Sequence, residues 1–217
     1  MIKKVVISII FIFLFSNYSF AYEDGDFQYW SAESVSWKIA KDCKMELEEE
    51  FRFGDDMSDF YHYHTDIGAT YSGLADWLDV GVNYWLSFEK KNNKWKYENR
   101  PHFNATLKYG IYGFDFSTRN RFEYRDKEDE SPFWRYRNKF TIKLPKFTKL
   151  EIQPYIAEEI FVDFKEEELN SNRVYGGVYL KILENLRGEI YYLWQSSKSN
   201  DDWLDTNILG TKIKLSF

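Results

Sequence analysis

Three side chains that can bind a metal ion alternate along one short stretch of the sequence: His62, His64 and Asp66. In a β-strand, alternate residues point to the same face, with about 7 Å between their Cβ atoms. That spacing is wide for one ion unless neighbouring strands supply further ligands, so the motif alone predicts neither a metal site nor another cofactor. We expect these side chains to form hydrogen bonds or to carry a charge that responds to pH.

The third histidine, His102, points to a different chemistry. Paired with a serine, it could act as the general base of a hydrolase that cleaves lipid or lipopolysaccharide from within a barrel wall. The serines expected on the same polar face are Ser34, Ser36, Ser72, Ser87 and Ser117. No local motif singles out one of them. The sequence therefore offers His102 as a catalytic candidate without a defined partner, and it favours a function that is not enzymatic.

Charged side chains form two groups on the polar faces of the predicted strands. The acidic group comprises Glu46, Glu48, Glu50, Asp66, Glu151, Glu159 and Asp163. The basic group comprises Arg119, Arg121, Arg125, Arg135, Arg137 and Lys139, with Glu123 among them. Because the basic residues fall on two consecutive segments that should pair as a hairpin, we expect them to form a contiguous wall. Opposed charged walls could select polar or anionic solutes in a small pore or binding barrel, whereas a salt-bridged interior would fill a narrow one.

The elements that carry these residues are β-strands, because the apolar period is two from residue 27 onward. At the C-terminus, for example, Leu209, Ile213 and Phe217 alternate with Lys212 and Lys214. We predict eleven such segments, at 27–39, 44–53, 60–72, 77–89, 95–109, 114–126, 133–144, 150–164, 173–182, 186–196 and 206–217. Short turns such as 145–148 are expected at one end of the strands and longer charged loops such as 165–172 at the other. No linker or repeat interrupts the series, so residues 22–217 form one domain.

The fold class predicted is all-β, a transmembrane antiparallel up-and-down β-barrel in which apolar side chains face lipid and polar ones face the lumen. The segments are longer than typical soluble strands. Aromatic side chains gather near their ends: Trp77, Trp95, Tyr97, Tyr109, Tyr124, Trp134 and Trp194. Since single-chain bacterial barrels usually have an even number of strands, we expect about twelve, with a further strand from 22–30, or else ten. A secreted soluble sandwich is the alternative.

Five polar residues break the alternation, because they fall on the predicted lipid face: Glu49, Asn99, Asn120, Asn138 and Glu158. A charge near the middle of a bilayer is costly. For Glu158, a β-bulge beside Glu159 or a place near the membrane interface would lower that cost.

The first 21 residues have the pattern of a cleavable signal peptide: Lys3 and Lys4, an apolar run, and the small residues Ser19 and Ala21. Loss of the two lysines with the leader changes the net charge from −6 to −8, which disfavours a nucleic-acid partner. The single cysteine, Cys43, excludes an intrachain disulfide. The 44 aromatic residues exclude disorder, although the mean hydropathy is −0.57. Export to the outer membrane of a Gram-negative bacterium is the predicted location.

Several stretches resemble a widespread family of bacterial outer-membrane proteins known as domain of unknown function number 2490. They are F-R-F-G-D-D (51–56), Y-H-T-D-I-G (63–68), W-L-D-V-G-V-N-Y (77–84), R-P-H-x-N (100–104), N-R-F-E-Y-R (120–125), W-R-Y-R-N-K (134–139) and I-Q-P-Y-I-A-E-E-I-F (152–161). The resemblance implies a barrel in outer-membrane lipid, recognised by the barrel-assembly machinery through the terminal aromatic Phe217. It implies no activity and no catalytic residue. A structural barrel that presents its outer loops to a partner is therefore a third alternative.

Overall fold

The computed structural model describes residues 24–165, 168–199 and 202–217. Within these ranges the chain forms eleven β-strands and no helix. They are β1 (Asp26–Ala40), β2 (Cys43–Gly54), β3 (Asp59–Ala75), β4 (Leu78–Lys91), β5 (Lys94–Ile111), β6 (Phe114–Lys127), β7 (Phe133–Lys143), β8 (Gln153–Asp163), β9 (Glu168–Leu183), β10 (Leu186–Ser199) and β11 (Asp202–Ser216). The strand positions predicted from the period of two are therefore confirmed, and the predicted signal peptide lies outside the described residues. None of the described residues lies in a helix long and apolar enough to cross a membrane.

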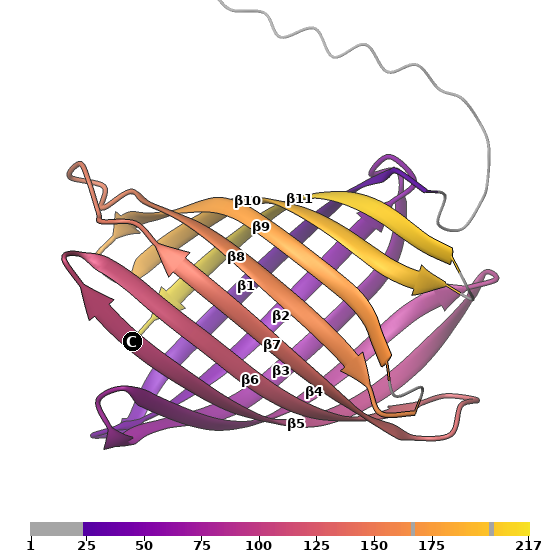
Figure 1. Cartoon of the computed structure of the whole chain (residues 1–217), viewed down its shortest axis with the longest axis horizontal. Coiled ribbons are helices and arrows are strands. Elements are labelled where there is room, and N and C mark those ends of the chain that lie inside the picture. The colour runs from indigo at the N-terminus through magenta and orange to yellow at the C-terminus, as the bar shows by residue number, and fades with distance from the viewer. Residues whose placement is uncertain (1–23, 166–167, 200–201) are drawn as a thin grey trace, which may run out of the picture.

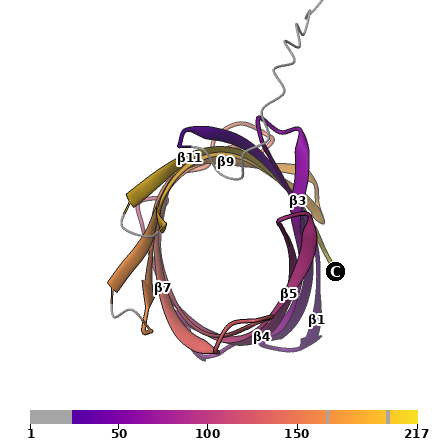
Figure 2. The same cartoon turned by 90° about the vertical axis from the view of Figure 1, so that its right-hand side faces the viewer.

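The strands close into one barrel, in which each strand pairs with its neighbour in sequence (Figure 1). The seam is formed by β1 and β11, which run parallel from Asp26 opposite Thr206 to Ser36 opposite Ser216. An odd number of up-and-down strands leaves the first and the last pointing the same way, so a parallel seam is the only closure open to eleven. No additional strand precedes β1 in the described chain, because Tyr29 and Trp30 already belong to it. Figure 2 shows the closed wall end on.

Inward and outward faces differ sharply in chemistry. In β8, Tyr155, Ala157, Glu159 and Phe161 are buried, while Ile156 is 56% exposed. The same alternation leaves large apolar side chains on the outside of most strands, for example Val82, which is 62% exposed. Exposed aromatic residues lie near both barrel ends, with Trp77 and Tyr109 at one and Trp95 and Trp134 at the other. The outside is thus an apolar band between two aromatic rims.

The inside is only partly apolar. A buried cluster covers the inward face of β1 and β8–β11, comprising Trp30, Tyr155, Ala157, Tyr175, Leu193 and Ile208. The inward faces of β2–β7 carry most of the buried charged groups instead. The hydrophobic core therefore lines one side of the lumen, and the charged residues line the other.

Connections between strands are short at both ends, which differs from the predicted alternation. The longest connection among the described residues, 144–152, lies at the end where short turns were expected, which is also the end that carries Phe217. Pro145 has no backbone N–H to donate to the sheet, so β7 stops at Lys143. At the other end, β9 and β10 continue through residues expected to be loop, such as Ser171 and Ser197, which pair with each other.

Candidate functional site

The basic residues of β6 and β7 form one wall inside the barrel. The register places Arg119 opposite Lys139, Arg121 opposite Arg137 and Glu123 opposite Arg135. All six positions belong to the inward-facing half of the alternation, and four of the side chains are almost completely buried: Arg121, Glu123, Arg135 and Arg137. A single hairpin therefore positions the cationic surface that the spacing in the sequence predicts.

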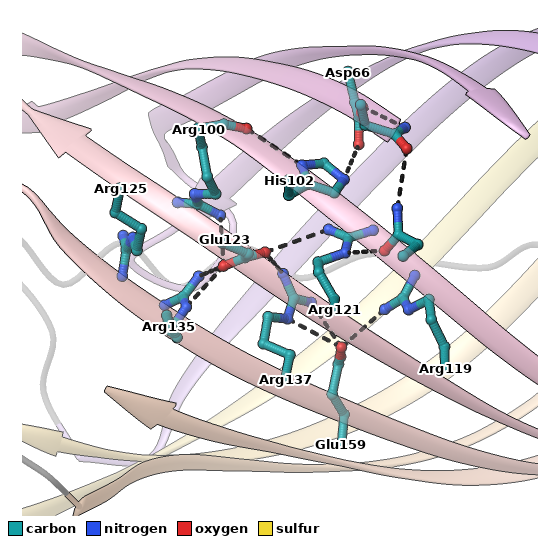
Figure 3. Close-up of polar contacts among 12 residues, drawn as sticks. Asp66, Arg100, His102, Arg119, Arg121, Glu123, Arg125, Arg135, Arg137 and Glu159 are labelled. Carbon is teal, nitrogen blue, oxygen red and sulfur yellow. Dashed lines mark hydrogen bonds and ion pairs between the residues drawn. The ribbon is translucent and has the colours of Figure 1, made fainter. Parts of the chain in front are cut away.

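Glu123 is the centre of this wall (Figure 3). Its carboxylate is inaccessible to solvent and accepts hydrogen bonds from Nε of Arg135 at 2.8 Å and from Nη1 of Arg137 at 2.9 Å. Nη1 of Arg121 lies 3.5 Å away and Nη1 of Arg100 lies 4.0 Å away. Four guanidinium groups thus surround one carboxylate, and the burial of that carboxylate is offset by charge-assisted hydrogen bonds.

A second carboxylate, that of Glu159 on β8, extends the network. Glu159 accepts hydrogen bonds from Nη2 of Arg119 at 2.9 Å, from Nη2 of Arg137 at 2.8 Å and from the Tyr175 hydroxyl at 2.9 Å. Arg137 therefore bridges Glu123 and Glu159 (Figure 3).

Glu98 on β5 receives paired hydrogen bonds from two arginines. Those from Arg100 measure 2.9 and 2.9 Å, and those from Arg125 measure 2.6 and 2.8 Å. In these contacts six arginines share three carboxylates: Arg100, Arg119, Arg121, Arg125, Arg135 and Arg137 with Glu98, Glu123 and Glu159. The cluster, which we call the arginine cluster, keeps an excess of positive charge inside the barrel.

Two chambers of similar size lie along the described part of the lumen. The arginine chamber has a volume of about 370 Å³ and opens toward the start of β1; its charged lining comprises Arg52, Arg100, Arg125, Arg135, Arg137, Arg173, Lys198, Glu89 and Glu98. The mixed chamber has a volume of about 380 Å³; its charged lining comprises Lys44, Arg52, Arg119, Arg121, Arg137, Lys139, Arg173, Lys212, Glu46, Glu48, Glu50, Asp66, Asp79, Glu159 and Glu189. Cations outnumber carboxylates seven to two in the first and are nearly balanced, eight to seven, in the second.

Five residues line both chambers and therefore lie between them: Trp30, Arg52, Trp85, Arg137 and Arg173. We call this set the septum. Its cations stack on aromatic rings, with Cζ of Arg52 3.7 Å and Cζ of Arg173 5.1 Å from the centroid of the Trp30 ring. Cation–π contacts of this kind gain strength away from water. The septum side chains are therefore held together where the two chambers meet.

The acidic residues of β2 lie in the mixed chamber and are held by neighbouring cations. Lys214 donates to Glu46 at 2.7 Å, Lys212 pairs with Glu48, and Nη2 of Arg52 lies 2.7 Å from Glu50. On the far side of the lumen, Lys139 stacks on Tyr175 at 3.6 Å.

Asp163, at the end of β8, receives a hydrogen bond from the side chain of Asn170. Glu151 lies outside the strands, in the connection 144–152, where it pairs with Lys146 at 2.8 Å.

The side chains of His62, His64 and Asp66 do not converge on a common position where a metal ion could bind. Nε2 of His62 lies 3.3 Å from Nδ1 of His64, but Asp66 instead accepts a hydrogen bond from Asn83 at 2.9 Å. A different group, Glu48, Glu50 and His64, has donor atoms within 4.8 Å of one another. Since Lys212 and Arg52 already neutralise its two carboxylates, this group is better described as part of the ion-pair network.

His102 lies in the arginine cluster without a nucleophile. Its Nδ1 is 3.3 Å from the backbone oxygen of Arg100, and its Nε2 is 3.7 Å from Asp66. Within the described residues Nε2 has no hydrogen-bond partner, so none of the candidate serines contacts it. The arrangement lacks the paired hydroxyl that nucleophilic catalysis by a histidine–serine pair requires.

Reasoning from the sequence missed several residues of the site. Glu98 and Arg100 share the face of His102 by alternation, so their positions along β5 could have revealed them. Trp30 and Arg52 lie directly opposite each other on the consecutive strands β1 and β2, so a hairpin register could have paired them. Arg173 carries no comparable signal, because it meets Trp30 only after β1 and β9 are curved around one lumen.

Comparison with known proteins identifies the family. A family model described as "Protein of unknown function (DUF2490)" matches residues 27–206, so the chain belongs to this family. The match spans β1 to the first part of β11 and contains the whole arginine cluster. No curated protein and no solved structure gives a significant match.

Proposed function

We propose that this protein is an outer-membrane β-barrel that binds small anionic solutes in its arginine chamber. The observation that carries this proposal is the excess of charge in that chamber, whose lining has seven cations and two carboxylates. A surplus of cations in a poorly solvated lumen is costly unless anions enter. A bound carboxylate or phosphate would supply the missing negative charge.

The groups that line this chamber suit such a ligand. A guanidinium offers parallel N–H donors that match the two oxygens of a carboxylate or phosphate. Arg173 donates to Gln195 at 2.6 Å, and no carboxylate oxygen of the described residues lies within 4.0 Å of its guanidinium. Among the arginines that line this chamber, it is therefore the one that makes no ion pair with the described residues.

Placement in the outer membrane is supported by the outer surface and by the sequence. The apolar band and aromatic rims suit a lipid bilayer with two interfaces. The leader at 1–21 would direct export, and Phe217, which is 72% exposed at the end of the seam, is available to the assembly machinery.

Binding is favoured over free passage because the septum lies between the two chambers. The septum residues belong to five different strands, and their stacked rings and cations line both chambers where these meet. The lipid hydrolase alternative has less support, since no hydroxyl contacts His102 among the described residues.

Two experiments test the proposal separately. Fractionation of bacterial cells that express the full chain should recover it in the outer membrane as a heat-modifiable band; recovery in the periplasm would reject the location. Isothermal titration of the purified barrel in detergent with citrate should show saturable binding that weakens as salt is raised. Absence of citrate and phosphate binding at low salt would reject the anion site while leaving the location intact.

A further inference from the structure

One polar stripe crosses the apolar outer face at the middle of the barrel wall. Asn138 is the central residue of β7, Glu158 is the central residue of β8, and Asn120 lies near the centre of β6. All three point outward, in contrast to the buried residues beside them in sequence. No register shift occurs at Glu158, and its side chain is exposed, so a bulge does not turn it inward.

The stripe has members on four adjacent strands. Asn120 lies directly opposite Asn138, and Glu158 on β8 lies diagonal to Asn138, because Ile160 is the residue directly between Asn138 and Asn172 in the register. Asn172 on β9 donates to Glu158 at 3.0 Å. Outward residues above and below the stripe are apolar, such as Phe122 and Phe140, which are about equally exposed at 43% and 44%.

In the membrane location proposed above, on which this inference rests, the stripe would face hydrocarbon. Polar groups at that depth are costly unless they have hydrogen-bond partners, and lipid tails provide none. A single outward asparagine can accept a hydrogen bond from a neighbouring tyrosine, as Oδ1 of Asn99 does from the Tyr84 hydroxyl at 2.6 Å. A stripe of several polar side chains is better explained by contact with another polar surface.

Hydrogen bonds inside the stripe leave a complementary pair of groups unused. Nδ2 of Asn138 donates to Oδ1 of Asn120 at 3.0 Å and to the hydroxyl of Thr118 at 2.9 Å. The Tyr136 hydroxyl donates to the same Oδ1 at 2.6 Å. Oδ1 of Asn138 and Nδ2 of Asn120 therefore make no hydrogen bond with the part of the chain that the structure describes.

The acceptor Oδ1 of Asn138 and the donor Nδ2 of Asn120 lie on adjacent strands, so the same pair of groups on a second copy of the chain could form hydrogen bonds with them. A two-fold axis beside the pair would set Nδ2 of Asn120 in one copy against Oδ1 of Asn138 in the other, and would do so twice, as isologous interfaces require. Glu158 lies one strand away from this pair, so its carboxylate and that of the second copy stay apart.

The wall beside the stripe also permits close approach. Gly176 is exposed on β9, and a Cβ built on it would meet no atom within 4 Å. Small residues next to polar ones favour tight packing between membrane segments.

We propose that the stripe formed by Thr118, Asn120, Asn138, Glu158 and Asn172 is the interface between two copies of this chain. The main test is the mass of the detergent-purified full-length protein by size-exclusion chromatography with light scattering. The wild type should have the mass of two chains. The double variant Asn120→Leu/Asn138→Leu should have the mass of one and remain heat-modifiable. Asn207→Leu, which removes an outward asparagine that Tyr192 holds on the far part of the wall, should stay dimeric.

A second measurement keeps the inference testable if the double variant does not assemble. In a Cys43→Ser background, co-expressed single variants Asn120→Cys and Asn138→Cys should form a disulfide-linked dimer in oxidised outer membranes, because these two positions oppose each other across the two-fold axis. Co-expressed Val82→Cys, on the outer face of β4, and Asn138→Cys should not. An outer-membrane barrel that is monomeric by mass and gives no dimer between Asn120→Cys and Asn138→Cys would overturn the interface and leave the proposed location standing. An adduct with a different protein, without homodimer, would also overturn it. Failure of the protein to reach the outer membrane would instead reject the location.

Discussion

Arg173 and Trp30 meet across the lumen, with Cζ of the arginine 5.1 Å from the centroid of the indole, although two strands separate β9 from β1 along the wall. On its other side, Arg173 stacks on Phe161 at 4.7 Å. Arg52 stacks on the Trp30 ring as well, with its Cζ 3.7 Å from the ring centroid. These alternating cations and rings lie where the arginine chamber and the mixed chamber meet, so a solute that moved from one chamber to the other would contact them.

Removing the indole should join the chambers. In Trp30→Ala, Arg52 and Arg173 lose the ring on which both stack, and the septum opens. We expect small solutes to enter proteoliposomes several-fold faster than with the wild type, measured by liposome swelling. Trp77→Ala, which removes an exposed indole from the outer rim, is the matched control and should leave the rate unchanged. Equal rates for Trp30→Ala and wild type would show that Trp30 does not restrict passage.

Neutralising the central carboxylate should weaken the fold. Glu123→Gln keeps the size of the side chain but leaves the surrounding guanidinium groups without their shared anion. Breaking a buried ion pair from one side costs about 3–5 kcal/mol, so the free energy of unfolding in urea should fall by that order. Glu130→Gln, at an exposed ion pair, should change it by less than about 1 kcal/mol. A Glu123→Gln barrel as stable as the wild type would contradict the proposed role of this carboxylate.

The least neutralised arginine should contribute most to anion affinity. Arg173→Gln removes a guanidinium that no carboxylate of the described chain neutralises. A hydrogen bond to a charged group contributes about 1.5–3 kcal/mol, which corresponds to a roughly 10- to 100-fold rise in the Kd for citrate. Lys44→Gln removes a cation from the mixed chamber and should change the Kd little. If both substitutions weaken binding equally, the effect is one of net charge and the arginine chamber is not the site.

The C-terminal residue should matter for assembly more than for stability. Phe217 closes the seam only through backbone bonds, its N–H to Ser36 at 2.8 Å and its oxygen to Lys38 at 3.2 Å, while its ring is exposed. Phe217→Ala keeps these bonds. It should therefore lower the amount of barrel in the outer membrane while leaving the urea midpoint of the refolded protein near that of the wild type. Normal membrane yield of Phe217→Ala would reject Phe217 as an assembly signal.

The fold was predictable because alternation is a local property. Each strand repeats its apolar and polar faces every two residues, so the positions of β1 to β11 follow from segments such as Leu209 to Phe217. The basic wall was predictable for the same reason, since β6 and β7 are consecutive and pair as a hairpin. The parallel seam was not, because strand number and closure depend on the whole barrel.

The complete septum and the outer stripe could be recognised only in the three-dimensional structure. Trp30 and Arg52 face each other across the β1–β2 hairpin, whereas Arg173 on β9 reaches Trp30 only through the curvature of the wall. Asn120, Asn138 and Glu158 looked like isolated exceptions in sequence. The register shows that Asn120 lies directly opposite Asn138 and that Glu158 lies on the next strand, diagonal to Asn138. The two histidines and Asp66 illustrate the reverse case, in which a suggestive local motif is separated by competing partners such as Asn83.

The most direct test of the central claim compares the affinity of the wild-type barrel for anions with its affinity for cations. Isothermal titrations of one detergent-purified sample with citrate and with spermidine, at low salt and at high salt, report the sign of the charge that the lumen prefers. Six arginines sharing three carboxylates predict saturable citrate binding that weakens with salt, and no measurable spermidine binding in the same range. Binding of spermidine as tight as that of citrate, or tighter, would contradict an anion-binding barrel.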